Sequence, residues 1–261
     1  MARYGILVAA LLTALTPLSA QPTSNGSIPV EIAVAVKRYP HDPRAFTEGL
    51  FIDAGQLFES TGEVGRSSVR RVDLATGKVL RSAIIPPPQF GEGIAPWRGQ
   101  ILSLTWQSGI GYRWDRKTLK QLGTFRYAGE GWSLTRAGSQ LVMSDGTDTL
   151  RFVDPRTFKV KRTLKVTVQG RPLRQINELE WVNGQIFANI WMTDYIARIN
   201  PVSGKVVGLI DVTALHKEAG AFGSNQVANG IAWDAARGKL YLTGKEWPAL
   251  FEVVLKPALQ K

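Results

Sequence analysis

The stretch EGLFIDAGQLFESTG, which covers residues 48–62, contains the unit that decides the fold. It begins with a polar anchor residue, Glu48, followed by small and apolar residues, and it ends with an apolar run that stops at Gly62. Five such runs end in the same register: 57–62 (LFESTG), 101–106 (ILSLTW), 141–146 (LVMSDG), 186–191 (IFANIW) and 240–245 (LYLTGK). The polar anchors that precede them are Glu48, Glu92, Glu130, Asn177 and Asn229. The chain is therefore an internal repeat with a period of about 45 residues.

Further segments complete each unit. A third strand-like segment, such as 68–74 or 195–200, leads into a turn rich in Thr, Ser, Gly and Lys, and a β-branched segment such as 206–212 follows. Apolar runs separated by turn residues predict strands and not helices. Four strands in about 45 residues are typical of a propeller blade. The alternative is a β-sandwich whose spacing is coincidental, and five matches in register argue against it.

The two ends of the repeat are expected to meet. The fifth unit lacks a fourth strand, because the chain ends soon after the segment 249–255, and the segment 30–38 supplies a spare strand. Pairing these two segments would close the ring and remove exposed strand edges. We therefore predict an all-β fold, a five-bladed β-propeller closed by its N-terminal strand, with one domain over residues 21–261.

The first twenty residues differ from the rest of the chain. Arg3 supplies a small positive region, residues 5–15 are apolar, and the small residues near Ala20 offer a cleavage site, which is the pattern of a secretory signal peptide. A transmembrane anchor is the alternative, but the apolar stretch is shorter than the roughly 20 residues that a span requires. We expect residues 1–20 to be cleaved and the mature chain to be secreted or periplasmic, without a stable membrane anchor.

Composition excludes several kinds of chemistry. The chain has 261 residues and no cysteine, so disulfides, thiol nucleophiles and Cys-ligated zinc are excluded. The net charge is +11, but the basic residues are scattered, which favours a soluble basic surface over a nucleic-acid partner. His41 and His216, the two histidines, have no metal-ligand spacing, and no serine elbow, Walker loop or dinucleotide fingerprint is present. Carboxylate acid–base chemistry and aromatic binding surfaces remain.

Equivalent positions of a propeller repeat lie on one ring around its axis. The ring at the ends of the second strands reads Gly62, Trp106, Gly146, Trp191 and Lys245. Strand ends open onto loops at a rim, where binding sites are usually built. Trp106, Trp191 and Lys245 replace small residues, so we interpret them as functional, whereas Glu130 and Asn229 are interpreted as structural anchors. The tryptophans predicted to pack between sheets are Trp97, Trp114, Trp181 and Trp233.

A series of short motifs at blade spacing resembles a known family. They are 46–50 (FTEGL), 59–62 (ESTG), 90–93 (FGEG), 104–106 (LTW), 129–132 (GEGW), 144–146 (SDG), 177–180 (NELE), 189–191 (NIW) and 242–247 (LTGKEW). In this order they resemble the glutamine cyclotransferases of plants and bacteria. The resemblance implies a five-bladed propeller that uses no catalytic metal and no cofactor. It also implies conversion of the N-terminal glutamine of peptides or proteins into pyroglutamate with release of ammonia, and we expect a monomer.

The resemblance also assigns residues. The catalytic carboxylate of the family matches Glu92. The residues that match its substrate pocket are Phe46, Phe90, Trp106, Trp132, Asn177, Trp191 and Lys245. Glu48 departs from the pattern, because plant members tend to carry Gln there. This departure leaves two roles open for Glu48 in the pocket, which are binding the substrate amine and tuning Glu92.

We expect Glu92 to accept the proton of the attacking amine and to deliver it to the departing ammonia. That work requires a pKa raised toward neutrality, which an aromatic pocket and a nearby Glu48 carboxylate would promote. Lys245, Asn177 or an indole N–H is expected to hold the amide oxygen. One alternative is a metal-dependent lactonase-like propeller, in which Glu48, Asn177 and another anchor residue would bind a divalent cation. The other is a non-catalytic propeller that binds sugars or peptides.

Overall fold

The computed structural model describes residues 27–258, so the expected signal peptide lies outside the described residues. Within this range the chain forms β-strands and one short helix, α1 (Thr213–Ala219). Three sheets have four strands each, one sheet has eight strands, and β14 (Thr167–Val168) pairs with β15 (Arg171–Pro172) as a small hairpin. The all-β prediction is confirmed for this part of the chain.

The three four-stranded sheets follow chain order. The first contains β2 (Thr47–Asp53), β3 (Gln56–Thr61), β4 (Ser68–Val72) and β5 (Val79–Ile84). The second contains β6 (Gly91–Trp97), β7 (Gln100–Thr105), β8 (Ile110–Asp115) and β9 (Gln121–Arg126). The third contains β10 (Ser133–Ala137), β11 (Gln140–Ser144), β12 (Thr149–Val153) and β13 (Val160–Lys165).

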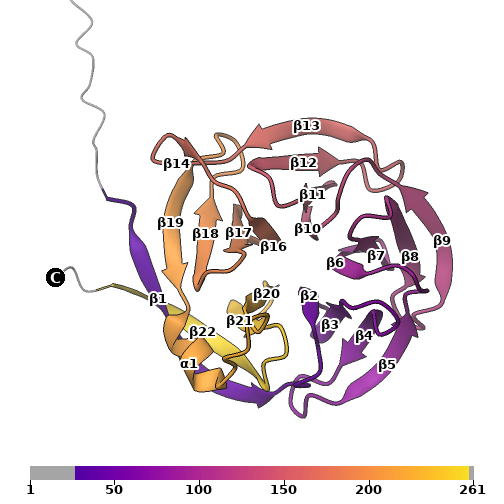
Figure 1. Ribbon diagram of the computed structural model, residues 1–261, viewed down its shortest axis with the longest axis horizontal. Helices are drawn as coiled ribbons and strands as arrows, with labels where there is room; N and C mark the ends of the chain where they lie inside the picture. The colour runs from indigo at the N-terminus through magenta and orange to yellow at the C-terminus, as the bar shows by residue number, and fades with distance from the viewer. Residues whose placement is uncertain (1–26, 259–261) are drawn as a thin grey trace, which may run out of the picture.

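The eight-stranded sheet combines two further sets of strands with the first strand of the described chain. Its first half contains β16 (Ile176–Val182), β17 (Gln185–Ile190), β18 (Tyr195–Ile199) and β19 (Val206–Asp211). Its second half contains β1 (Val30–Pro40), β22 (Ala249–Pro257), β21 (Lys239–Gly244) and β20 (Ala228–Asp234). Figure 1 shows the sheets arranged around a central axis, with β2, β6, β10, β16 and β20 innermost. The arrangement is therefore propeller-like.

The strand β1 lies between β19 and β22. It pairs with β22 in antiparallel register from Glu31–Pro257 to Pro40–Ala249, with a bulge between Ala35 and Lys37. The sequence predicted this partner for the segment 30–38. A short parallel ladder from Val30 to β19, which joins the two halves of the sheet, was not predicted.

The turn between the third and fourth strands repeats because its chemistry repeats. In the first sheet, Asp73 Oδ1 accepts hydrogen bonds from the backbone N–H of Thr76 and from its hydroxyl, at 2.8 and 2.7 Å. Gly77 then adopts a left-handed φ of +67°, where a Cβ atom would lie 2.4 Å from the carbonyl oxygen of Pro40. Asx turns of this kind compete with regular structure and end the strand. The turn therefore ends the third strand at Val72, within the segment 68–74 that the sequence predicted as a strand.

Two buried carboxylates on β16 tie the innermost strands together. Glu178 accepts hydrogen bonds from the backbone N–H groups of Leu50 and Ile231, at 3.3 and 3.0 Å. Glu180 accepts from the Trp233 N–H and the Thr135 hydroxyl, both at 3.0 Å. Inner edges of the sheets carry backbone groups without strand partners, and these carboxylates satisfy several of them. Burial raises the pKa of Glu178 well above its usual value and that of Glu180 to about 7.

Apolar side chains fill the spaces between neighbouring sheets. Trp97 and Trp114 are buried in two of these apolar clusters, and Trp181 and Trp233 pack, partly buried, against two others, as their interpretation as packing residues required. Each large apolar side chain that is buried in this way stabilises the fold by about 1.5–3 kcal/mol. No helix within residues 27–258 is long and apolar enough to cross a membrane.

Candidate active site

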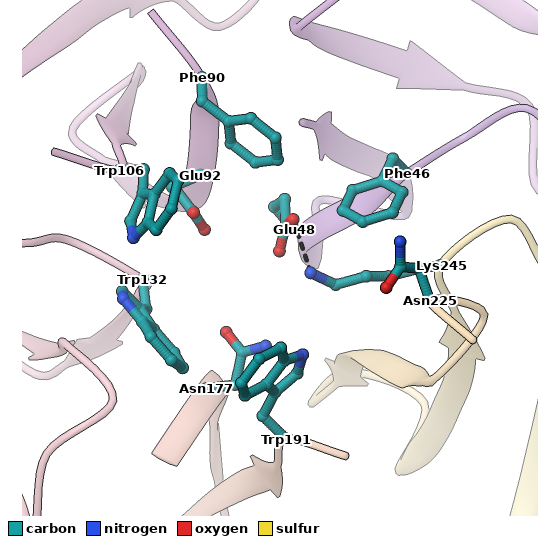
Figure 2. Close-up of a pocket in the computed structure, with 10 residues that line it drawn as sticks. All are labelled: Phe46, Glu48, Phe90, Glu92, Trp106, Trp132, Asn177, Trp191, Asn225 and Lys245. Carbon is teal, nitrogen blue, oxygen red and sulfur yellow. Dashed lines mark hydrogen bonds and ion pairs between the residues drawn. The ribbon is translucent and has the colours of Figure 1, made fainter. Parts of the chain in front are cut away.

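A pocket lies at the ends of the inner strands, where side chains from the three four-stranded sheets and the eight-stranded sheet, or from the loops next to them, converge (Figure 2). Its lining consists of Phe46, Glu48, Phe90, Glu92, Trp106, Trp132, Asn177, Trp191, Asn225 and Lys245. Every site residue that the sequence predicted is in this set, and Asn225 is an addition. The pocket holds about 220 Å³, which is below the roughly 300–1,000 Å³ of sites for drug-sized ligands. A single amino-acid side chain suits this volume.

β-Bulges in the innermost strands orient the anchor residues toward the pocket. In β2 the pairing with β3 shifts by one residue between Thr47 and Gly49, and the same shift occurs at 91–94 in β6 and at 176–179 in β16. Glu48, Glu92 and Asn177 lie in these bulges. Because a β-bulge bends its strand and re-aims a side chain, the repeat brings these three groups to one point.

Asn229 lies in a fourth bulge of the same kind, at 228–231. It is fully buried, and its amide donates hydrogen bonds to the Thr47 carbonyl oxygen at 2.8 Å and to Glu48 Oε2 at 3.3 Å. These contacts agree with the structural role that the sequence suggested for Asn229. Its effect on the pocket is to restrain Glu48.

Strand pairing in the third sheet shows that one of the predicted anchor residues is wrong. In the first two sheets the residue two positions after the anchor, Leu50 or Ile94, pairs with the third residue of the second-strand run. The corresponding pair in the third sheet is Leu134 with Met143. Trp132 therefore occupies the anchor position, and the prediction of Glu130 was wrong by two residues. The Glu-Gly dipeptide at 130–131 imitates those at 48–49 and 92–93 but precedes the structural register.

Glu92 is a buried carboxyl group whose pKa is raised by its surroundings. The residue is only 6% exposed to solvent. Burial raises the pKa of Glu92 well above its usual value, the Glu48 carboxylate adds to this effect, and Lys245 opposes it. A carboxyl group with a raised pKa both accepts and donates protons more readily near neutral pH. Glycine after it is required, because a Cβ atom on Gly93 would lie 2.4 Å from the Ser133 Cα.

Glu48 and Lys245 form a buried ion pair. Lys245 Nζ lies 2.6 Å from Glu48 Oε1, and the same ammonium lies 4.5 Å from the centroid of the Phe46 ring. Burial raises the pKa of Glu48, and the Lys245 ammonium works against this shift. Of the groups that the sequence suggested as holders of the amide oxygen, Lys245 is thus already engaged by Glu48.

Aromatic rings form the walls of the pocket. Phe90 contacts both Phe46 and Trp106 edge to face, with ring centroids 6.1 and 6.0 Å apart. On the other side Trp132 meets Trp191 in the same way at 5.8 Å. Edge-to-face pairs stabilise each other by about 0.5–1.5 kcal/mol beyond their burial. The rings therefore form two walls, and within each wall neighbouring rings are in contact.

The polar groups of the pocket differ in whether they are already engaged. The indole N–H groups of Trp106 and Trp132 both donate to Glu130 Oε2, each at 2.8 Å. By contrast, the side-chain amide of Asn177 and the indole N–H of Trp191 make no hydrogen bond to other groups among residues 27–258. Asn177 and Trp191 are the lining groups best placed to hold a new oxygen atom.

Other residues stand outside this pattern. Asn225 is exposed in the loop between α1 and β20, which has no counterpart in the repeat, so the sequence contained no signal for it. His41 lies between the Trp247 carbonyl oxygen and Glu59, and His216 lies between Asp194 and Ala221. No group of three or more His, Cys, Asp or Glu within residues 27–258 is arranged to hold a metal ion.

Comparison with known proteins identifies the family of this chain. The sequence model of the family described as glutamine cyclotransferase matches residues 7–255. The chain is 41% identical over 231 residues to a glutaminyl-peptide cyclotransferase of Arabidopsis thaliana, covering 87% of this chain and 72% of that protein. Its fold matches the crystal structure of glutaminyl cyclase from Myxococcus xanthus with a TM-score of 0.84 and 36% identity, over 89% of this chain and all of that one. The chain belongs to the glutamine cyclotransferase family.

Proposed function

We propose that this protein is a glutaminyl-peptide cyclotransferase in which Glu92 is the single acid–base group. Its substrates would be peptides or proteins whose N-terminal glutamine enters the pocket. Family membership supports the activity. The observation that supports the mechanism is a buried carboxyl group, with a pKa raised by its surroundings, inside a small aromatic pocket.

The reaction needs one proton to move twice. The α-amine of the substrate attacks the carbon of its own side-chain amide, and a C–N bond forms as the amine loses a proton to the Glu92 carboxylate. Glu92 then returns this proton to the amide nitrogen, the second C–N bond breaks, and ammonia leaves. Atoms and protons balance without another reactant. General acid–base catalysis of this kind contributes about 10²–10⁴-fold to the rate.

The rest of the pocket supports this chemistry in two ways. The aromatic walls restrict the flexible glutamine side chain to a bent shape that brings amine and amide together, which lowers the entropic part of the barrier. The Asn177 amide and the Trp191 indole N–H, which have no protein partner in the described chain, would donate to the oxyanion that develops on the amide oxygen.

Replacing Asn177 with alanine is expected to lower kcat by about 10²-fold and to change KM much less, because an oxyanion donor acts mainly in the transition state. Trp191→Phe keeps the ring and removes only the N–H, so it should show a smaller loss of the same kind. Steady-state kinetics of ammonia release measure both. Asn225→Ala is the control, since it removes an exposed amide from the same pocket. A kcat within threefold of the wild type for Asn177→Ala would place the donor elsewhere.

Ammonia release from a Gln-initiated dipeptide is expected to proceed equally with and without EDTA, because the proposed steps use only Glu92. Loss of activity in EDTA, restored by Ca²⁺ or Mn²⁺, would instead favour the lactonase-like reading. Binding of the dipeptide without any release of ammonia would favour a non-catalytic propeller.

We also propose the number of blades, the closure of the ring and the export of the protein. The eight-stranded sheet would count as two blades joined through β1, which makes five blades with the three separate sheets and closes the ring. Residues 1–20 would be a signal peptide, and residues 21–261 a secreted or periplasmic monomer. Mass spectrometry of the exported protein tests the cleavage, with Gln21 expected at its N-terminus.

A further inference from the structure

We propose that Glu130 is a positioning residue that holds Trp106 and Trp132 as walls of the pocket, and that it thereby sets the affinity for the glutaminyl side chain. The inference rests on the proposed function, because the ligand is the substrate of that reaction. Glu130 itself is absent from the pocket lining and acts through the two indoles.

The Glu130 carboxylate binds three side chains, and we call this arrangement of Glu130 with Trp106, Trp132 and Gln107 the fork. Glu130 Oε2 accepts the indole N–H groups of both Trp106 and Trp132 at 2.8 Å. Glu130 Oε1 accepts a third hydrogen bond from the side chain of Gln107 at 2.9 Å. Trp106 follows β7 and Trp132 precedes β10, so this single carboxylate joins residues of two different sheets.

The fork links the two aromatic walls. One wall runs from Phe46 through Phe90 to Trp106, and the other consists of Trp132 and Trp191. Trp106 remains 40% exposed, so packing alone restrains its ring weakly. Hydrogen bonds to a charged acceptor are about twice as strong as neutral ones. The carboxylate therefore determines the distance between the walls where they face each other.

Glu130 is itself fixed in place and charged. The Arg151 guanidinium donates to the Glu130 carbonyl oxygen at 2.7 Å and also contacts Asp145 at 3.2 Å. Burial works against ionisation, but hydrogen bonds from Trp132, Gln107 and Trp106 lower the pKa of Glu130. The negative charge adds to the forces that raise the pKa of Glu92. Glu130 thus has two separable effects. Its carboxylate oxygens accept hydrogen bonds that hold the indoles, and its negative charge raises the pKa of Glu92.

Two variants separate these effects. Glu130→Ala removes both acceptor atoms, and we expect KM for a Gln-initiated dipeptide to rise about tenfold while kcat changes by less than threefold, the equivalent of one charged hydrogen bond. Glu130→Gln retains one oxygen that can accept both indoles, so it should restore most of the wild-type KM. Both variants lack the charge, so in both the acid limb of the kcat/KM profile should move to lower pH as Glu92 ionises more easily.

A double-mutant cycle tests whether the effect passes through the indoles. If it does, Glu130→Ala in a Trp106→Phe background should raise KM less than in the wild type, because one of the two indole donors is already absent and only Trp132 loses its partner. Acrylamide quenching of tryptophan fluorescence should increase in Glu130→Ala and return toward the wild-type level in Glu130→Gln. The charge-matched control is Glu218→Gln, on the exposed face of α1, which should change none of these values.

The outcomes are distinguishable from failure of the proposed function. If the wild type releases no ammonia, the function fails, and the quenching experiment still reports on the fork. If the wild type is active and Glu130→Ala keeps both KM and quenching unchanged, the positioning role is wrong. The role would also be overturned in favour of a purely structural residue if Glu130→Ala lowered kcat and raised KM by equal factors, lowered the melting temperature and was not rescued by Glu130→Gln. In that case its effects would also be additive with those of Trp106→Phe.

Discussion

Replacing Glu92 with glutamine is expected to lower kcat by about 10³-fold, within the range that a general acid–base group contributes. Gln fills nearly the same volume but neither accepts the proton of the attacking amine nor returns it to the leaving nitrogen. Stability should be unchanged or higher, because the substitution removes a buried carboxyl that the Glu48 carboxylate repels. Ammonia release under saturating dipeptide measures kcat, and thermal unfolding measures stability.

The contrast with a remote acid makes this experiment specific. Glu218→Gln makes the same change of charge on the exposed surface of α1 and should leave kcat unaffected. A Glu92→Gln enzyme that retains kcat within tenfold of the wild type, with an unaltered melting temperature, would contradict the assignment of both proton transfers to Glu92.

Replacing Lys245 with methionine is expected to destabilise the protein by about 3 kcal/mol, because removal of one partner leaves the other charge buried and unpaired. Glu48 would remain in the pocket beside Glu92 without the ammonium that now lies 2.6 Å from it. For a chain of this size the melting temperature should fall by about 6–12 °C. Activity should fall as well, since a displaced Glu48 no longer keeps its position near Glu92.

The double variant Lys245→Met/Glu48→Gln separates charge from packing. Neutralising Glu48 removes the unpaired charge, so the double variant should recover most of the lost stability. If it melts as low as Lys245→Met alone, the cost comes from methionine in the Lys245 position and not from the orphaned carboxylate. Thermal unfolding of the wild type, both single variants and the double variant completes the cycle.

The sequence was informative about strands because their alternation and turns are local properties. The runs at 57–62 and 101–106, for example, became β3 and β7, whereas β4 ends at Val72, two residues before the end of the predicted segment 68–74, because Asp73 begins the turn. The helix α1 and the hairpin β14–β15 were missed, since both are insertions that the repeat does not contain. The parallel contact of β1 with β19 depends on how the two halves of the eight-stranded sheet meet, which no local pattern encodes.

The site was predictable to the extent that it follows the repeat and the family resemblance. Trp106, Trp191 and Lys245 stood out as bulky residues at positions that are otherwise glycine, and all three line the pocket. The partners of these groups were not predictable, because the Glu48–Lys245 pair and the indole contacts of Glu130 depend on side-chain directions across different sheets. The error at Glu130 has the same origin: a dipeptide match cannot detect a two-residue shift in pairing.

The position of β1 has a consequence for how the nascent chain folds. Tyr39 and Glu252, which bond across the β1–β22 pair, are separated by 213 residues, so β1 keeps an unpaired edge until nearly the whole chain has been made. Contacts this distant slow folding and prolong exposure of an edge that invites aggregation. The same pairing brings Ala258 N–H within 2.9 Å of the Val30 carbonyl oxygen. A circularly permuted gene that joins these ends and opens a surface loop elsewhere would turn the most distant contact of the fold into a local hairpin.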